Sequence, residues 1–218
     1  SDFMSDEDTV VCAAGSLPGD MHKLWRTGNG SQYHMEYGYS CMGYEIAGGL
    51  GIRLAKDNGD VVVMVGDGSF LMMNSEIITA LQENIKIIIV LINNHGFGSI
   101  NGLSISLGSK GFGNLYRERD HKTGDYSGNE LPINFTKLAE SFGIEAVMVE
   151  EREALKDALE VARNSNSSYL IEVSVDPEVR VPGYEAWWNV PVAEVSEMPS
   201  VDEARAEYEK RLKDEREF

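Results

Sequence analysis

Long apolar runs separated by amphipathic segments dominate the middle of this chain of 218 residues. Two of the runs, at 60–66 and 86–93, are continuous rather than alternating, which is typical of parallel strands covered on both faces. Three shorter apolar runs predict further strands, at 10–15, 145–149 and 169–175. Apolar residues at helical spacing predict helices over 18–27, 41–56, 72–83, 134–142 and 151–164. This alternation predicts an α/β fold: a doubly wound, mostly parallel sheet with helices on both faces.

The ends of the chain and two internal segments lack this pattern. We expect four regions: a disordered or cloning-derived N-terminus (1–9), an α/β domain (10–176), an irregular aromatic arm (177–199) and a C-terminal helix (200–218). Within the domain, two segments are rich in glycine and predict loops, at 28–40 and 95–132. The second is long enough to be functional or mobile.

Charge and composition narrow the class of protein. The formal net charge is −17, which argues against nucleic acid as a partner, because phosphate binding needs clustered Lys and Arg. No apolar run is long enough to span a bilayer, and we find no pattern of a signal peptide. Cys12 and Cys41 have no spacing typical of a zinc site or a disulfide framework. We therefore expect a cytoplasmic protein that does not bind membranes.

Small polar residues follow the two longest strands, with Asp67 after the first and Asn94 after the second, 27 residues later. Ligands of open α/β sheets bind beyond the carboxyl ends of the strands, and adjacent parallel strands would bring these two side chains together. Gly68 and Gly96 leave the neighbouring backbone free to turn, and Ser69 opens the following helix. Together these residues predict a site for a hard cation that bridges to a diphosphate.

Taken singly, these residues have simpler interpretations. Asp67 alone could be the N-cap of a helix, and Asn93-Asn94 alone could be a turn. The stretch "GDGSFL" is neither a dinucleotide fingerprint, since the third glycine is absent, nor a P-loop, since no Gly-Lys-Ser/Thr follows.

The combination resembles the signature of thiamine-diphosphate enzymes, in which GDG is followed at this distance by NN. The resemblance implies that the Asp67 side chain, the Asn94 side chain and the Gly96 carbonyl bind Mg²⁺, and that the metal holds the diphosphate. It also implies cofactor contacts from residues outside the metal set: Met42, Gly66, Gly68, Ser69 and Phe97. Met42 would prop the cofactor into its bent shape, whereas in isolation it would be interpreted as a core methionine.

Longer stretches, including "YHMEYGYSCMGYEIAGGLG" and "VPGYEAWWNVPVAEVS", resemble the carboxyl-terminal part of the trihydroxycyclohexane-1,2-dione hydrolases of inositol catabolism. The resemblance implies opening of a cyclic 1,2-diketone to 5-deoxy-glucuronate. It also implies a homodimer or homotetramer, and an activating glutamate in an amino-terminal domain that is missing here. By this interpretation the chain alone is inactive.

His34 is a candidate for contacting the substrate, because it lies just before Met42 in a polar segment; the alternative is a surface or supporting histidine. Two other functions stay open. One is an acetolactate synthase-like or other thiamine-diphosphate carboligase or decarboxylase. The other is a non-catalytic small-molecule-binding or assembly domain, which the presence of both Asp67 and Asn94 disfavours.

Overall fold

The computed structural model describes residues 1–28, 30–36, 38–183 and 186–215. The chain divides into two compact units. The sheet unit comprises Ser1–Gly96 and Pro132–Val179, and the second unit comprises Phe97–Leu131 and Arg180–Phe218. Residues 97–131, which we expected inside the domain 10–176, therefore cluster with the C-terminal part of the chain.

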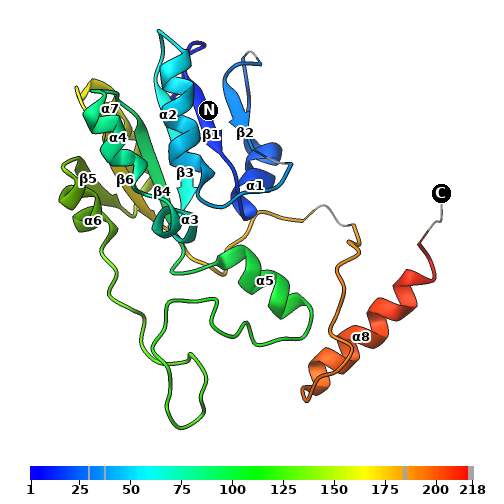
Figure 1. Ribbon diagram of the computed structural model, residues 1–218. Coiled ribbons are helices and arrows are strands. Elements are labelled where there is room, and N and C mark those ends of the chain that lie inside the picture. Colours follow the sequence, from blue (N-terminus) through cyan, green and yellow to red (C-terminus); the bar gives the residue numbers. More distant parts are fainter. Residues whose placement is uncertain (29, 37, 184–185, 216–218) are drawn as a thin grey trace. The chain divides into compact units, whose positions relative to one another are not determined.

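The sheet unit is built on six strands that are all parallel, in the order β2-β1-β3-β4-β6-β5 (Figure 1). The strands are β1 (Thr9–Cys12), β2 (Tyr33–Met35), β3 (Val61–Gly66), β4 (Ile88–Asn93), β5 (Glu145–Val149) and β6 (Tyr169–Ser174). The central strands are buried because their runs of Val, Ile and Leu supply apolar side chains to both faces. The predicted α/β architecture is confirmed.

Helices cover both faces of this sheet. The helices that pack on it are α1 (Ser16–Leu24), α2 (Tyr44–Ala55), α3 (Asp67–Met72), α4 (Glu76–Gln82), α6 (Phe135–Phe142) and α7 (Arg152–Asn164). On one face, Ile46 of α2, Ile77 of α4 and Phe135 of α6 share a buried cluster with Val63 and Ile89 of the sheet. Successive strand residues point to opposite faces, so the neighbouring strand residues supply the other cluster.

On the opposite face, Val62 and Ile88 pack with Ala162 of α7, and Val10 packs with Met21 of α1. No helix among the described residues is long and apolar enough to cross a membrane.

Two of the predicted elements differ from the structure in the sheet unit. The predicted loop 28–40 contains β2, which pairs with β1 in parallel register; three residues are too few to show a strand period. The predicted helix 72–83 corresponds to α4, and the separate helix α3 precedes it, because the chain leaves helical geometry at Met73. Ser69, which we expected to open the following helix, is the third residue of α3 and lies in its first turn.

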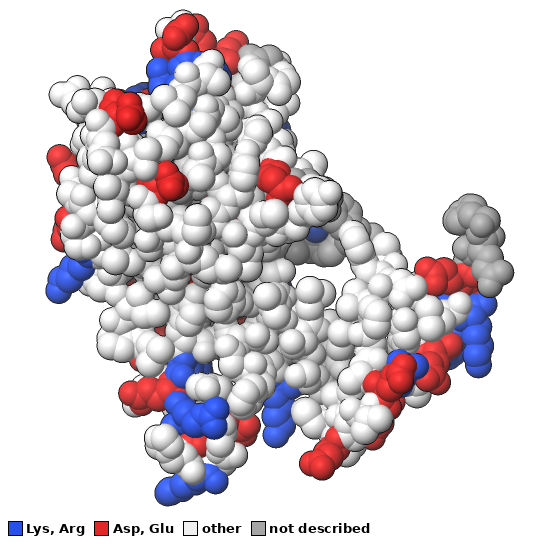
Figure 2. All heavy atoms as spheres, viewed as in Figure 1, with Lys and Arg blue, Asp and Glu red and all other residues white. Residues whose placement is uncertain are grey.

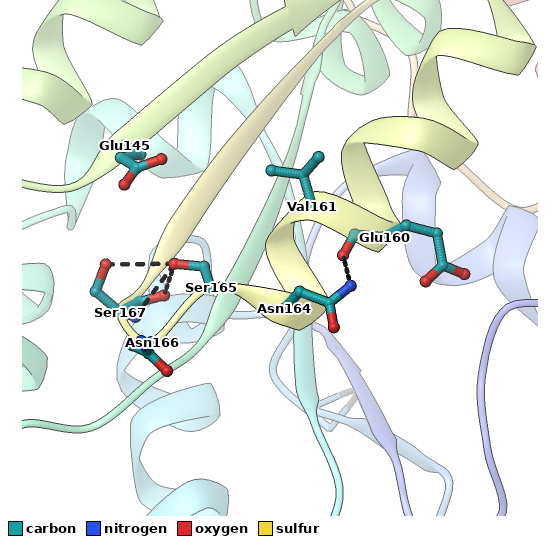
Figure 3. A pocket seen from close by; sticks show the side chains of 7 residues that line it. All are labelled: Glu145, Glu160, Val161, Asn164, Ser165, Asn166 and Ser167. Carbon is teal, nitrogen blue, oxygen red and sulfur yellow. Dashed lines mark hydrogen bonds between the residues drawn. The ribbon is translucent and has the colours of Figure 1, made fainter.

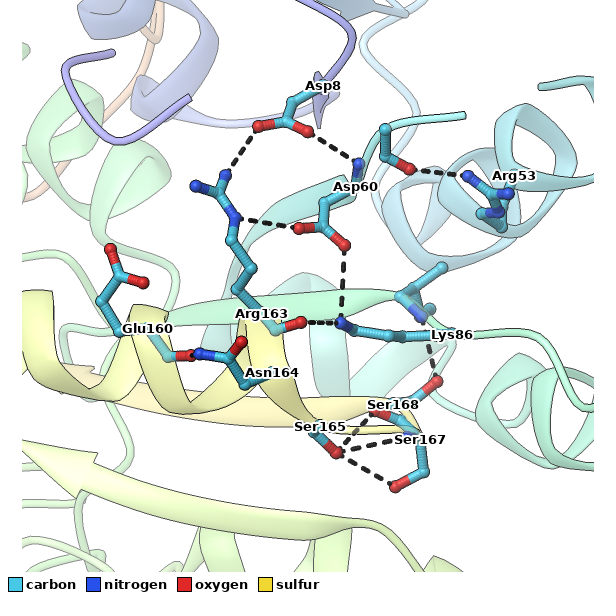
Figure 4. A network of polar contacts seen from close by, with 12 residues as sticks. Asp8, Arg53, Asp60, Lys86, Glu160, Arg163, Asn164, Ser165, Ser167 and Ser168 are labelled. Atoms are coloured by element: carbon cyan, nitrogen blue, oxygen red, sulfur yellow. Dashed lines mark hydrogen bonds and ion pairs between the residues drawn. The ribbon is translucent and has the colours of Figure 1, made fainter. Parts of the chain in front are cut away.

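The N-terminal residues also differ from the prediction of a disordered segment 1–9. Thr9 begins β1, and Asp8 is only 3% exposed. Figure 4 shows the reason at the amino-terminal edge of the sheet: Arg163 of α7 donates to Asp8 at 2.7 Å and to Asp60 at 3.1 Å. Lys86 adds an ion pair to Asp60 at 3.5 Å. This network connects the end of α7 to the starts of β1, β3 and β4, and its role is structural.

The second unit contains α5 (Gly98–Ser106) and α8 (Pro199–Leu212). The expectation of a loop throughout 95–132 is thus wrong for α5, whose sequence of Gly, Ser and Asn shows almost no amphipathic period. The Ser200 hydroxyl donates to the Gly108 carbonyl at 2.6 Å and joins the two segments. In the arm 177–199 only Pro199 lies in a helix among the residues described; 184–185, and 216–218 of the predicted C-terminal helix, lie outside the described part.

Charged side chains of both signs are interspersed on the face drawn in Figure 2, and α8 carries both. Along α8, Glu207 pairs with Arg211 at 2.7 Å, and Arg205 pairs with Glu209 at 2.8 Å. Pairs of this kind on an exposed helix contribute only a few tenths of a kcal/mol each, about 0.3–0.5.

Candidate functional site

The polar residues singled out in the sequence meet at the carboxyl edge of the sheet. Asp67 follows β3 directly, and Asn94 follows β4 directly. The two strands are neighbours, with Gly66 in register with Ile92. The predicted adjacency of the two strand ends is therefore confirmed.

Asp67 is a buried carboxylate held by backbone amides. Its side chain accepts the Gly68 N–H on Oδ1 and the Gly96 N–H on Oδ2, each at 2.9 Å. Burial raises the pKa of Asp67 to about 6, against the lowering effect of these two hydrogen bonds. Within the described part of the chain, Asp67 forms no ion pair with Lys or Arg. A buried carboxylate without a cationic partner is a natural ligand for a metal ion.

The Asn94 side chain completes a set of converging oxygens. Its carboxamide oxygen faces the Gly96 carbonyl oxygen at 2.7 Å and Asp67 Oδ1 at 3.3 Å. Oxygens this close repel one another unless a proton or a cation lies between them. Rotating the amide would let its NH₂ group donate to both oxygens. A cation bound by all three would equally relieve the repulsion, and carboxylate, carboxamide and carbonyl oxygens are the ligands that Mg²⁺ takes. The residues present therefore fit the expected metal.

Asn93 shapes the turn that presents these ligands. Its Nδ2 donates to Glu172 Oε1 at 2.8 Å, and its Oδ1 accepts the His95 N–H at 3.0 Å. The backbone of His95 is in the left-handed region, with a φ of 60°, which is uncommon for a residue other than glycine. The side chain of Asn93 thus points into the sheet unit, while that of Asn94 faces Asp67 and the Gly96 carbonyl. Sequence reasoning missed Glu172, although a charged residue within the apolar run of β6 was a signal.

Space is open beside the end of β3, where the cofactor residues are expected. A Cβ built at Gly66 would meet no atom within 4 Å. The Gly68 N–H is already bonded to Asp67, and the Ser69 hydroxyl is bonded to Glu45.

Glu45 is a second buried acid at this edge, and sequence reasoning assigned it no role. It lies in the first turn of α2 and is 1% exposed. Its carboxylate accepts the Gly43 N–H at 3.0 Å and the Ala14 N–H at 3.3 Å, in addition to the Ser69 hydroxyl. Burial raises the pKa of Glu45. Its only signal in the sequence was an acid at the start of an otherwise apolar, glycine-rich helix.

Met42 and His34 lie in the segment that leads into α2. Met42 is half-buried and, among the described residues, belongs to none of the three core clusters. His34 lies in β2 and its Nε2 is 2.7 Å from the Tyr44 hydroxyl, with the two rings stacked 5.8 Å apart. The structure thus joins His34 to the start of α2 and shows no hydrogen bond between His34 and Asp67 or Asn94 among the described residues.

Phe97 is the first residue of the second unit. Its N–H donates to the Asn114 carbonyl at 2.8 Å, and its ring meets that of Tyr116 edge to face, with centroids 5.9 Å apart. The N–H of Phe97 is therefore bonded within its own unit in this structure.

A surface depression of about 580 Å³ lies at the opposite, amino-terminal edge of the sheet (Figure 3). It is lined by the end of α7, the start of β5 and the turn before β6, and Glu145 and Glu160 are among its lining residues. It holds none of the predicted site residues, and two acids beside a helix C-terminus would repel a diphosphate.

The structure thus defines an α/β domain with an all-parallel sheet, in which a buried acid and a carboxamide converge at the carboxyl edge. Residues 13–173 match the family described as "Thiamine pyrophosphate enzyme, C-terminal TPP binding domain", and the chain belongs to this family. The resemblance found in the sequence is confirmed.

Curated relatives match the whole chain. It is 45% identical over 215 residues to a protein of Clostridium botulinum (strain Alaska E43 / Type E3), covering 99% of the chain and 33% of that relative. It is 42% identical over 218 residues to one of Bacillus subtilis (strain 168), covering 100% of the chain and 33% of that relative. Both are named 3D-(3,5/4)-trihydroxycyclohexane-1,2-dione hydrolase. The chain spans about a third of the length of these relatives.

Among solved structures, the thiamine diphosphate-dependent 4-hydroxybenzoylformate decarboxylase of Rhodococcus jostii RHA1 superposes with a TM-score of 0.65 at 23% identity. The match covers 80% of this chain and 31% of that chain. A likeness at this identity supports the fold.

Proposed function

We propose that this chain is the diphosphate-binding part of a thiamine-diphosphate- and Mg²⁺-dependent hydrolase that opens trihydroxycyclohexane-1,2-dione to 5-deoxy-glucuronate. In this reaction the bond between the two carbonyl carbons breaks. The oxygen of one water molecule enters the new carboxylic acid, and hydrogen is gained by the carbon that becomes the aldehyde. Support comes from the names of the relatives that match 99–100% of the chain.

The single observation that carries the site is the convergence of the Asp67 carboxylate, the Asn94 carboxamide and the Gly96 carbonyl at the carboxyl edge of the sheet. We assign these three as the protein ligands of Mg²⁺, which would share its remaining positions with the diphosphate and water. When bound, thiamine diphosphate supplies the nucleophilic carbon and the electron sink for cleavage. The chain's own residues hold and orient it.

The remaining predicted residues have supporting roles in this proposal. The open space at Gly66 would accept the diphosphate, with Gly68 and Ser69 beside it. Met42, which packs in no core cluster of the described residues, would support the bent cofactor. His34 would face the substrate through the segment before Met42, and the backbone near Phe97 would contact the diphosphate.

The rest of the enzyme is also part of the proposal. Because the chain spans about a third of its relatives, we propose that further domains supply the activating glutamate and that this chain alone is inactive. We further propose a cytoplasmic homodimer or homotetramer, with the cyclic diketone as the small-molecule substrate.

The test uses an enzyme of the relatives' full length that contains this chain, loaded with thiamine diphosphate and Mg²⁺. We expect it to convert the cyclic dione to an acid that also carries an aldehyde, and we expect Asp67→Ala to be inactive. A second arm supplies pyruvate alone. Formation of acetolactate with an inert dione would contradict the hydrolase and favour the carboligase.

A further inference from the structure

Three segments of the sheet unit donate hydrogen bonds to one buried carboxylate, that of Glu45. The Ala14 N–H belongs to the turn after β1, the Gly43 N–H directly follows Met42, and the Ser69 hydroxyl belongs to α3. All three donate to Glu45, which is 1% exposed. The three segments surround the carboxyl edge on which the proposed cofactor site lies.

We propose that Glu45 is a positioning residue for the cofactor: it holds the turn of Met42, the turn after β1 and the diphosphate segment at Ser69 in one fixed arrangement. The inference rests on the proposed function for the identity of the ligand. The mutual positioning of the three segments rests on the contacts alone.

The chemistry of the contacts requires a carboxylate at this position. Three donors from other segments and the N–H of Glu45 itself converge on two oxygens, and an ionised carboxylate is the kind of side chain that accepts hydrogen bonds on every side without donating one. Its place in the first turn of α2 adds the favourable field of the helix N-terminus. Glutamine would turn an NH₂ group toward at least one of the donors, and the buried group left unpaired would be costly.

The residues on either side of Met42 each donate a backbone N–H to an acid. Before it, Glu36 accepts the Cys41 N–H at 2.8 Å and the Tyr39 N–H at 3.1 Å; after it, Glu45 accepts the Gly43 N–H. Glu36 contacts only its own loop in these bonds, whereas Glu45 also reaches the turn after β1 and α3. We therefore expect the two acids to have different effects: Glu36 orders one loop, whereas Glu45 couples three segments.

The first readout is amide hydrogen exchange of the cofactor-free, full-length enzyme. In Glu45→Gln we expect exchange to be at least about tenfold faster in peptides covering 13–16, 41–44 and 67–72, since each lost bond is worth about one order of magnitude. Glu36→Gln should speed exchange only around 38–42. The control is Asp8→Asn, another buried acid, at the opposite edge of the sheet, which should lower the melting temperature and leave these three peptides unchanged.

A second variant keeps the test decisive if Glu45→Gln fails to fold. Ser69→Ala preserves the carboxylate and removes one donor, so exchange should rise at 41–44 as well as locally at 67–72. A rise confined to 67–72 would overturn the coupling through Glu45.

The second readout is the titration of thiamine diphosphate with Mg²⁺, for which we expect about tenfold weaker binding by Glu45→Gln and unchanged binding by Asp8→Asn. Unchanged exchange in Glu45→Gln would overturn the inference whether or not cofactor binds. Changed exchange with equal affinity in wild type and Glu45→Gln would overturn the role toward the cofactor. If exchange changes in Glu45→Gln as expected but the wild-type enzyme binds no thiamine diphosphate, the proposed function is contradicted instead.

Discussion

The buried carboxyl of Asp67 makes the stability of the metal-free protein depend on pH. Its pKa rises from 3.8 to about 6, and burial is the main cause. At 1.36 kcal/mol per unit, this shift corresponds to about 3 kcal/mol. A carboxyl whose pKa is raised on folding stabilises the folded state below its unfolded pKa and loses that advantage as the pH rises through the folded pKa. We therefore expect a loss of about 2.5 kcal/mol between pH 4 and 7.5, with about half of it above pH 5.

Asp67→Asn separates this titration from the hydrogen bonds. The amide cannot titrate, but its single oxygen cannot accept both the Gly68 N–H and the Gly96 N–H, so the variant has a cost of about 1–3 kcal/mol at every pH. The free energy of unfolding of the wild type minus that of the variant should fall by about 1.5 kcal/mol from pH 5 to pH 7.5.

The assay is urea unfolding at pH 5, 6, 7 and 7.5 in the presence of a chelator. A difference between wild type and Asp67→Asn that stays constant over this range would refute the reasoning, because it would show that Asp67 does not change its charge there. Adding Mg²⁺ at pH 7.5 should stabilise the wild type and leave the variant unaffected, since only the wild type has the ionised ligand.

Three further changes test the frame that supports the site. Arg163→Met leaves the buried Asp8 carboxylate without its partner and should lower the free energy of unfolding by about 3 kcal/mol in urea, with no change in cofactor affinity. Phe70→Ala empties a position that is 0% exposed and should lower that free energy by about 3–5 kcal/mol, seen as a large drop in melting temperature. Gly59→Ala places a Cβ against the Glu7 carbonyl at a φ of 80° and should lower the free energy of unfolding in urea by more than about 1 kcal/mol, whereas an unchanged free energy would show that this turn relaxes.

The sequence predicted the central sheet and the proximity of Asp67 and Asn94 because both follow from strong local signals. The continuous apolar runs of β3 and β4 required burial on both faces, and this made them neighbours in a parallel sheet. Once they were neighbours, Asp67 and Asn94 had to meet at one edge. The Gly96 carbonyl followed only from the resemblance to a known signature, since any backbone carbonyl has the same chemistry.

Features that depend on tertiary contacts were not predictable in this way. The strand β2 is three residues long at the edge of the sheet, and α5 is made of residues with weak helical period. The role of Glu45 depends on donors at Ala14 and Ser69, which lie 31 and 24 residues away in the chain. The contact between His34 and Tyr44 likewise requires β2 to lie beside the start of α2.

The most direct test of the central claim, a Mg²⁺-dependent diphosphate site at Asp67, Asn94 and Gly96, is calorimetric titration of thiamine diphosphate into the full-length enzyme. The titration is run with Mg²⁺ and with a chelator, for the wild type, Asp67→Ala, Asn94→Ala and the matched control Asp60→Asn at the opposite edge. The account predicts binding by the wild type and by Asp60→Asn that requires Mg²⁺, and none by the other two variants. Equal binding by all four proteins, or binding that ignores Mg²⁺, would contradict it.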